Sequence, residues 1–188
     1  MSTEDATSQT LTVPIPKGAT LTAGARSITA KGPLGSVTRP FPREALEFAS
    51  TKAGVVLTLK IPANRKKAKA LLHTWERHVA NLAGGVTTGF EAKMKVVAAH
   101  FPMKVQVKDG TLLIENFLGE KHPRSAPLLP GVSAAVDGDI VTLTGHDVEI
   151  VGQSAANIER ATKIRDYDPR VFQDGIYITV RAHLKEAA

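Results

Sequence analysis

The sequence contains no cysteine, which removes whole classes of chemistry before any pattern is considered. Without a thiol the chain forms no disulfide, offers no thiolate to a metal and has no cysteine nucleophile. It also lacks any apolar run near the roughly 20 residues that span a bilayer. Its first ten residues are polar and acidic, unlike a secretion signal. We therefore expect a soluble protein that stays in the cell that made it.

Aromatic residues are also scarce, at 5% of 188 residues, although hydrophobic residues reach 43%. A packed core is therefore expected, built mainly of Val, Ile, Leu and Ala, and wholesale disorder is excluded. The net charge of +6 favours a polyanionic partner, of which nucleic acid is the commonest in a cell. A mildly basic enzyme has a similar charge, so composition leaves both classes open. The positive charge is concentrated in residues 1–85.

Two stretches of the chain share one order of elements. In each, short β-type runs lead through a Leu-Gly loop to a helical stretch, with Leu34-Gly35 in the first and Leu118-Gly119 in the second. Ile28 and Ile114 occupy similar places ahead of these loops. Coincidence between ordinary hairpin patterns is the alternative, but the matched order favours duplication. We expect an α+β protein of two tandem duplicated domains, each a small, mostly antiparallel β-sheet packed with one main helix.

The boundaries of the two repeats follow from the same patterns. The first repeat is expected to cover residues 11–85 and the second residues 86–182. A disordered tail at residues 1–10 and a C-terminal tail at residues 183–188 flank them. Residues 116–130, which contain Gly and Pro, are expected to form a long loop within the second repeat.

The two helices are predicted from apolar spacing. The first is expected to begin after Asn64 as its N-cap and to stop at Gly84-Gly85. The second is expected to begin near Gln153, after a strand that carries Val148 and Ile150. The apolar stripe of the first helix consists of Ala68, Leu71, Leu72, Trp75, Val79 and Leu82.

Two hairpins and a final strand complete the prediction for the second repeat. Asp109-Gly110 and residues 137–139 are turn sequences between alternating runs. Ile176, Ile178 and Val180 alternate as a last strand.

No arrangement typical of an active site emerges. The six histidines include no pair at the i, i+4 spacing of a zinc site, and His78 is expected at the edge of the core. Asp147 and Glu149 would share one side of a strand, where a carboxylate pair can serve acid–base chemistry. No nucleophile or Gly-rich cradle accompanies them, so a solvated strand edge is the expected role. We predict no catalytic residue, no cofactor and no metal site.

Basic clusters are more informative. Arg65-Lys66-Lys67 and Lys69 fall in the first turns of the long helix, where the helix dipole favours acidic residues. A bound phosphate would reverse that balance, because the cations and the free backbone N–H groups then act together. A solvated charged face is the alternative reading of this cluster.

Other cations fall on strand faces, loops and helix ends. Lys93 and Lys95 share one face of a strand, and residues 121–124 form a basic segment in the long loop. Lys163, Arg165 and Arg170 surround the end of the second helix. Such positions suit irregular RNA, in which shape and phosphates dominate recognition. Taken one at a time, each cluster is ambiguous.

Residues 170–178, Arg-Val-Phe-Gln-Asp-Gly-Ile-Tyr-Ile, resemble the C-terminal signature of the universal large-subunit ribosomal protein six family, in its archaeal–eukaryotic branch and closer to the archaeal form. Ile164 and Arg181 also fit it. Two positions depart: Arg160 stands where the family usually has Gln, and Tyr167 where it usually has Lys or Arg. The second change puts one phosphate contact in doubt. Further similar segments are residues 31–35, 93–102, 116–121, 151–159 and 168–170.

The resemblance covers about residues 11–182 and implies a structural protein held by large-subunit rRNA, mainly through its second domain. It implies a place in the cytoplasmic ribosome near the sarcin–ricin loop and the stalk base, as a monomer beside other ribosomal proteins and transiently near translation GTPases. A free RNA-binding regulator or processing factor is the main alternative, and a hydrolase using Asp147 and Glu149 is a remote one. The candidate rRNA contacts are Lys31, Arg65, Lys66, Lys67, Lys69, Lys93, Lys95, Lys121, His122, Arg124, Lys163, Arg165, Arg170, Asp174, Gly175 and Tyr177.

Overall fold

The chain folds into two compact units, which we call unit 1 (residues 1–87) and unit 2 (residues 88–188). Each has its own hydrophobic core. Of the expected N-terminal tail, residues 1–10, only Thr10 is among the described residues. Asn64 and Arg65 also lie outside the described residues. The computed structural model describes residues 10–24, 27–41, 46–51, 54–59, 66–168 and 170–185.

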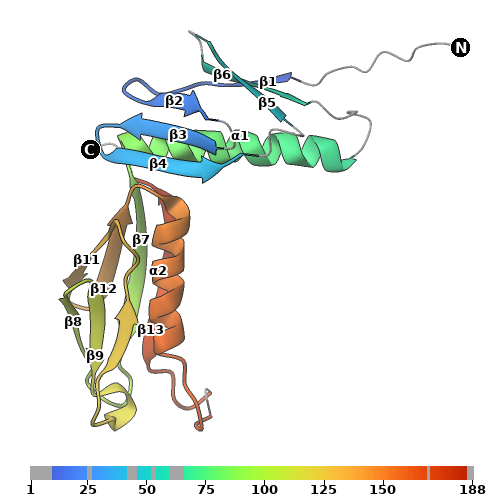
Figure 1. Ribbon diagram of the computed structural model, residues 1–188. Helices are drawn as coiled ribbons and strands as arrows, with labels where there is room; N and C mark the ends of the chain where they lie inside the picture. Colours follow the sequence, from blue (N-terminus) through green and yellow to red (C-terminus); the bar gives the residue numbers. More distant parts are fainter. Residues whose placement is uncertain are drawn as a thin grey trace, which may run out of the picture. The chain divides into compact units, whose positions relative to one another are not determined.

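Unit 1 contains two antiparallel three-stranded sheets and one long helix (Figure 1). The strands of the first sheet, in spatial order, are β1 (Thr10–Val13), β6 (Gly54–Leu59) and β5 (Leu46–Thr51). Those of the second are β2 (Thr20–Ala23), β3 (Ser27–Gly32) and β4 (Gly35–Pro40). Strand β5 was not predicted. The helix α1 (Lys66–Thr87) packs against both sheets.

The apolar stripe of α1 was predicted correctly where its side chains are described. Leu72, Trp75, Val79 and Leu82 are buried in the core of unit 1. The predicted stop at Gly84-Gly85 is wrong, because the helix continues to Thr87.

The end of α1 is determined by tertiary contacts. Val86 is fully buried, so the helix runs on until this side chain is packed. The backbone N–H of Leu34 then donates to the Val86 carbonyl at 3.1 Å. A Cβ on Gly32 would lie 2.5 Å from that same oxygen, so the β3–β4 loop can approach the helix only with glycine there. The chain leaves the helix at Gly89, which has a φ of +80°.

Unit 2 also contains two antiparallel sheets and one main helix, α2 (Val148–Ala161). A short 3₁₀ turn, η1 (Phe117–Gly119), follows β9. The four-stranded sheet has the order β11 (Val132–Asp137), β12 (Ile140–Gly145), β7 (Phe90–Val97) and β13 (Gly175–Leu184). The second sheet has the order β10 (Arg124–Pro127), β9 (Thr111–Glu115) and β8 (Lys104–Lys108).

Both predicted hairpin turns of unit 2 are confirmed. Asp109 and Gly110 have φ values of 49° and 70°, and Gly138 has a φ of 55°. These left-handed conformations are those of tight hairpin turns, which explains the Asp-Gly pairs. The predicted loop at residues 116–130 is wrong in part, because it contains η1 and the strand β10.

The two units repeat one plan, which confirms the predicted fold class. In each unit a first strand is followed by three further strands, then by a two-stranded hairpin and then by the helix. Unit 2 has one additional strand, β13, after its helix. The sequence matched Ile28 of the first repeat to Ile114 of the second, but the equivalent residue is Leu112. Leu112 lies as many residues before Leu118 as Ile28 lies before Leu34. All of these core positions except Leu34 are buried. Neither helix in the described part of the chain has the length and apolarity that crossing a membrane requires.

Candidate nucleic-acid interface

One end of unit 2 joins η1, the start of β10 and the loop that follows α2 (Figure 1). Arg124 makes this connection. Its guanidinium donates through NH1 to the carbonyls of Ala161 at 2.8 Å and of Lys163 at 3.2 Å. The last carbonyls of a helix have no partner within the helix. Arg124 therefore neutralises the negative end of α2 and holds the following loop against β10.

The rest of the Arg124 guanidinium is also occupied. It donates to the two carboxylate oxygens of Glu120 at 2.5 and 2.8 Å and lies 4.2 Å above the ring centre of Phe117. The hydrogen bond from Arg124 lowers the pKa of Glu120 below its ordinary value, against the opposing effect of burial. Arg124, predicted as a phosphate contact, is thus committed to the fold of this end of the molecule.

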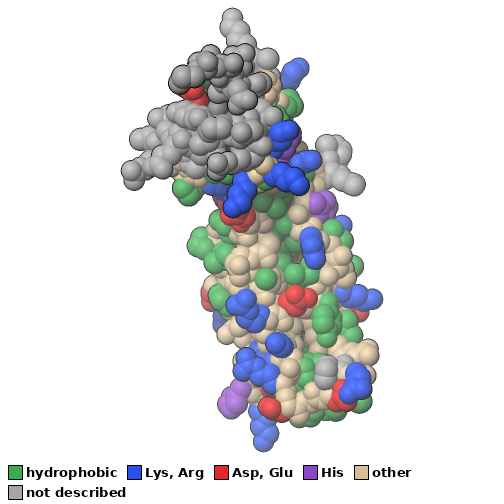
Figure 2. Space-filling model, turned by 90° about the vertical axis from the view of Figure 1, so that its right-hand side faces the viewer, with side chains coloured by type: hydrophobic (Ala, Val, Ile, Leu, Met, Phe, Trp, Pro, Cys, Tyr) green, Lys and Arg blue, Asp and Glu red, His purple; other side chains and the backbone are tan. Residues whose placement is uncertain are grey.

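Three further cations lie beside Arg124. Arg160, Lys163 and Arg165 are exposed and line a depression with a volume of about 390 Å³. None of the three side chains makes an ion pair or hydrogen bond with a residue of the described ranges. Figure 2 shows Lys and Arg side chains distributed over one face of unit 2 and at its lower end. The remaining residues that line the depression are Pro123, Arg124, Ser125 and Ala161.

Arg160 was not among the predicted contacts. A signal for it was present, because Arg160 lies three residues before Lys163, at the end of the predicted second helix. The predicted contacts Lys163 and Arg165 are brought together here, whereas Lys121 and His122 are exposed in the turn between η1 and β10.

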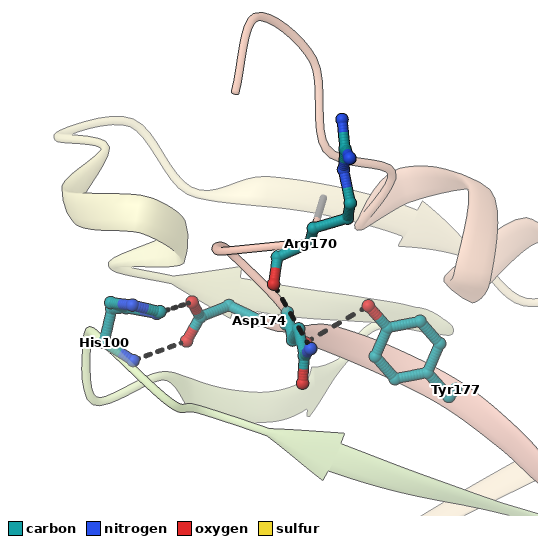
Figure 3. A network of polar contacts seen from close by, with 5 residues as sticks. His100, Arg170, Asp174 and Tyr177 are labelled. Carbon is teal, nitrogen blue, oxygen red and sulfur yellow. Dashed lines mark hydrogen bonds and ion pairs between the residues drawn. The ribbon is translucent and has the colours of Figure 1, made fainter. Parts of the chain in front are cut away.

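The loop after α2 is a tight turn organised by Asp168. Its carboxylate accepts from the backbone N–H of Arg170 at 2.9 Å and from the Arg170 guanidinium at 3.3 Å. The segment from Asp168 to Phe172 is not extended, since the N–H groups of Val171 and Phe172 turn back to the Asp168 carbonyl. The Arg170 side chain is 90% exposed and points away from the polar network of Figure 3.

Phe172 anchors this loop. It packs against the core of unit 2, and its ring lies 4.8 Å from the rings of both His100 and Tyr167. The loop therefore has an aromatic support beneath its exposed cation Arg170.

The side chain of Asp174 is fully buried. Its carboxylate accepts from the His100 backbone N–H at 2.9 Å and from the His100 Nδ1 at 3.0 Å (Figure 3). Burial by itself raises the pKa of Asp174, but the hydrogen bonds from His100 and from the Ala99 backbone outweigh it, and the pKa lies below its ordinary value.

Gly175 is also buried. Its φ lies outside the left-handed region that favours glycine. A Cβ at this position would lie 3.0 Å from the Tyr177 ring, so a larger residue would require that ring to shift by a few tenths of an ångström. The Tyr177 hydroxyl donates to the Gln173 carbonyl at 3.2 Å, and the ring remains partly exposed (Figure 3).

Lys95 lies between two partly apolar neighbours on the outer face of the four-stranded sheet. It pairs with Ile140 on one side and Tyr177 on the other, and all three side chains are exposed. Lys93 is exposed on the same face, where its Nζ lies 3.6 Å from the Glu91 carboxylate. The predicted common face of the two lysines is confirmed.

The remaining candidates belong to unit 1. Lys66, Lys67 and Lys69 are exposed on the first turns of α1, and Lys31 is exposed near the end of β3. Arg65 lies outside the described residues. The first turn of α1 contains no acidic residue, so the lysines there are not balanced locally.

The two carboxylates considered for catalysis, Asp147 and Glu149, lie at the start of α2 and stabilise the helix there. α2 begins at Val148 instead of Gln153, and Asp147 is its N-cap, accepting from the Glu149 backbone N–H at 2.9 Å. Glu149 lies in the first turn, where it complements the helix dipole. His78 lies at the core edge as predicted, with its ring 5.2 Å from Trp75 and its Nδ1 2.8 Å from Arg39. Within the described ranges, no three His, Asp or Glu side chains are grouped to hold a metal.

The fold and the surface together define the class of protein. It is a duplicated α+β protein whose basic residues lie on helix ends, loops and an open sheet face. Residues 101–175 match the family model described as ribosomal protein L6. The chain is 46% identical over 166 residues to the large ribosomal subunit protein uL6 of Methanobrevibacter smithii, covering 88% of this chain and 92% of that one. It is 45% identical over 171 residues to the same protein of Methanosarcina mazei, covering 91% and 96%.

The chain belongs to the ribosomal protein L6 family. A further relative, uL6 of Natronomonas pharaonis, is 42% identical over 167 residues, covering 89% of this chain and 93% of that protein. These relatives are archaeal, which confirms the resemblance to the archaeal form. They are named as large ribosomal subunit proteins, and the capping role of Asp147 also speaks against the hydrolase alternative.

Proposed function

We propose that this protein is a structural component of the large subunit of the cytoplasmic ribosome and holds rRNA mainly through the end of unit 2. The depression lined by Arg160, Lys163 and Arg165 carries this proposal. Three exposed cations without an ion pair to any described residue, in one open depression, suit phosphate groups of a folded RNA backbone.

The neighbourhood of the depression favours an anion. A helix C-terminus normally repels phosphate, because its free carbonyls carry partial negative charge. Here Arg124 donates to the carbonyl of Ala161, the last residue of α2, and to that of Lys163 in the following loop, and Glu120 balances the charge of Arg124. The surface offered to a partner is therefore that of the three remaining cations.

The other exposed candidates extend this interface. Lys121, His122 and Arg170 lie in the turns next to the depression, and Lys93 and Lys95 on the sheet face with Tyr177. In unit 1, Lys31 and the lysines at the start of α1 provide a second rRNA contact. Arg124, Asp174 and Gly175 act by holding these segments in place.

We further propose that the bound rRNA lies near the sarcin–ricin loop and the stalk base, where translation GTPases dock. The resemblance of residues 170–178 to the family signature supports this placement. The protein would act there as a monomer beside ribosomal proteins of the stalk base. Cross-linking of assembled subunits followed by mass spectrometry tests it, and cross-links confined to proteins distant from the stalk base would contradict it.

A charge-matched pair of variants tests the depression. Lys163→Gln with Arg165→Gln removes two cations from it, and Lys104→Gln with Lys108→Gln removes two exposed cations from β8. Both are expressed as tagged full-length chains and followed through a density gradient. We expect the first pair to shift from large subunits to the free pool and the second pair to stay with subunits.

Equal occupancy of the two variants would contradict the role of the depression. A wild-type chain that travels apart from large subunits would instead support the alternative of a free RNA-binding regulator.

A further inference from the structure

Tyr167 presents an aromatic ring to solvent at the end of unit 2. Its residue surface is 51% exposed, although Tyr is usually more buried than this in a folded chain. The inner side of the ring lies 4.8 Å from the ring centre of Phe172, at an interplanar angle of 56°. The ring is thus in contact with Phe172 while about half of the residue surface stays open to solvent.

Phe172, which contacts the Tyr167 ring, is itself packed against residues of the core of unit 2. The Phe172 ring lies 4.8 Å from the His100 ring, and His100 is held by the buried carboxylate of Asp174. Three rings are therefore connected to an anchor that has no exposed surface.

The backbone around Tyr167 is also constrained. Asp166, just before it, has a φ of +65°, a left-handed conformation that non-glycine residues adopt rarely and at a cost. Asp168, just after it, closes the turn through the N–H groups of Val171 and Phe172. Strain of this kind persists where the surrounding structure holds a side chain in a defined position. Tyr167 consequently loses little further freedom when another group packs on it.

The charges near the ring distinguish between two parts of a nucleotide. Arg165 and Arg170 are exposed on either side in sequence and suit phosphates. Asp166 and Asp168, directly next to the tyrosine, repel a phosphate at the ring itself. A base is neutral, and its exocyclic amine can donate to a carboxylate such as that of Asp166. The ring is therefore suited to a base, with the adjoining phosphates on the two arginines.

We propose that Tyr167 is a stacking platform for one unpaired base of the rRNA held by unit 2. The inference rests on the proposed rRNA binding and names the part of the RNA that this loop takes. An unpaired base has an open π-face, and stacking on an aromatic side chain is a general means of holding it. Arg165 and Arg170 bind the backbone on either side of that base.

Three substitutions separate stacking from a purely structural role. Tyr167→Phe keeps the ring, Tyr167→Leu covers Phe172 without a ring, and Tyr167→Ala removes both. The full-length chain is titrated with its own large-subunit rRNA, transcribed in vitro, at several salt concentrations. We expect the Phe variant to bind like the wild type. The Leu and Ala variants should lose about 5- to 150-fold in affinity, the range for one base stacked on an aromatic ring.

The salt dependence provides an independent readout. Tyr167 carries no charge, so its variants should keep the wild-type slope of log K against log salt. Arg165→Gln, which removes a cation that binds phosphate, should reduce that slope by roughly 0.7–0.9. Thermal unfolding of each variant is measured in parallel, and the Leu variant is expected to melt like the wild type because Phe172 stays covered.

Ultraviolet cross-linking of the wild-type complex completes the test without any substitution. We expect the peptide that contains Tyr167 to carry one nucleotide from an unpaired rRNA position. A Leu variant with wild-type affinity, or a cross-link to a paired base, would overturn the stacking proposal while rRNA binding stands. A wild-type chain that fails to bind rRNA would overturn the proposed function itself.

Discussion

The buried carboxylate of Asp174 accepts two hydrogen bonds from one residue, His100, which lies 74 positions earlier in the chain. One oxygen takes the backbone N–H and the other takes the imidazole Nδ1. The pair joins the segment after β7 to the segment before β13. Because the His100 ring supports Phe172, the same pair determines where the loop with Arg170 and Tyr167 lies.

The first prediction concerns acid stability. The pKa of Asp174 is lower in the folded chain than its ordinary 3.8, so its ionised form stabilises the fold at higher pH. That contribution is complete above the ordinary value and is lost as the pH falls through the lower folded pKa. Asp174→Asn should remove this part of the pH dependence and destabilise unit 2 at neutral pH by about 1–3 kcal/mol, as expected for a buried hydrogen-bonded carboxylate.

Hydrogen exchange of peptides from β7 and β13, corrected for the intrinsic effect of pH, measures the change within unit 2. Asp168→Asn is the control, since this carboxylate is half exposed and lies in the same loop. An Asp174→Asn chain with the wild-type pH profile would show that the carboxylate adds nothing to stability.

The second prediction concerns Gly175 and Tyr177. A Cβ at position 175 would lie 3.0 Å from the Tyr177 ring, so Gly175→Ala should displace the ring and break its hydrogen bond to Gln173. We expect a loss of about 0.5–1.5 kcal/mol, the contribution of one hydrogen bond. In a Tyr177→Ala background the same change should be neutral or stabilising, because alanine restricts the unfolded chain more than glycine does.

Chemical unfolding of the four chains of this double-mutant cycle measures the coupling. Losses that simply add would mean that Gly175 is needed for a reason other than the Tyr177 ring. The larger change Gly175→Val should behave like Gly175→Ala with a greater loss, since its added carbons must also be accommodated.

The third prediction concerns the only tryptophan. Trp75 is 8% exposed, and its ring meets Phe41 edge-on at 4.9 Å in the core of unit 1. Trp75→Ala should destabilise unit 1 by about 3–5 kcal/mol, and Trp75→Phe should cost clearly less. Hydrogen exchange of peptides from β3 and α1 reports this. Wild-type protection in the alanine chain would contradict the burial of Trp75.

Much of the fold could be predicted because its signals are local. The stripe through Trp75 and Val79 follows the helical period, and Asp109-Gly110 is a turn sequence by itself. The second helix was started too late because Val148 and Ile150 alternate like a strand, while the capping bond from Glu149 to Asp147 is visible only in the structure. The end of α1 was misplaced for a similar reason, since burial of Val86 outweighs the usual effect of two glycines.

Only the exposed charged residues of the candidate site could be predicted from the sequence. Exposed cations such as Lys163 and Arg165 are recognisable in a basic segment, and the structure leaves them exposed. The role of Arg124 depends on carbonyls 37 and 39 positions away, and no local pattern indicates such a contact. The tight approach of the Tyr177 ring to position 175 is likewise visible only in the structure.

The last prediction concerns the basic start of α1. Lys66, Lys67 and Lys69 are exposed, the first turn has no acidic residue, and cations at a helix N-terminus oppose the helix dipole. Changing these lysines and Arg65 to Gln should therefore leave the stability of unit 1 unchanged or raise it by about 0.3–1 kcal/mol. If the cluster binds rRNA, the same variant should bind more weakly, with a slope of log K against log salt reduced by roughly 0.7–0.9 for each phosphate that is no longer neutralised.

A variant of equal charge separates local binding from the general effect of removing four cations. Its exposed substitutions are Lys17→Gln, Arg77→Gln, Lys104→Gln and Lys108→Gln. Titration of rRNA at several salt concentrations, with thermal unfolding of the same samples, should show a smaller slope for the α1 variant than for this control. Equal slopes would mean that the lysines of α1 form a solvated face, because distant charge is largely screened at physiological salt and only directly bound cations release counterions. If the stability of the α1 variant rises while its affinity for rRNA falls, the lysines form a binding surface that the protein retains although they destabilise the helix.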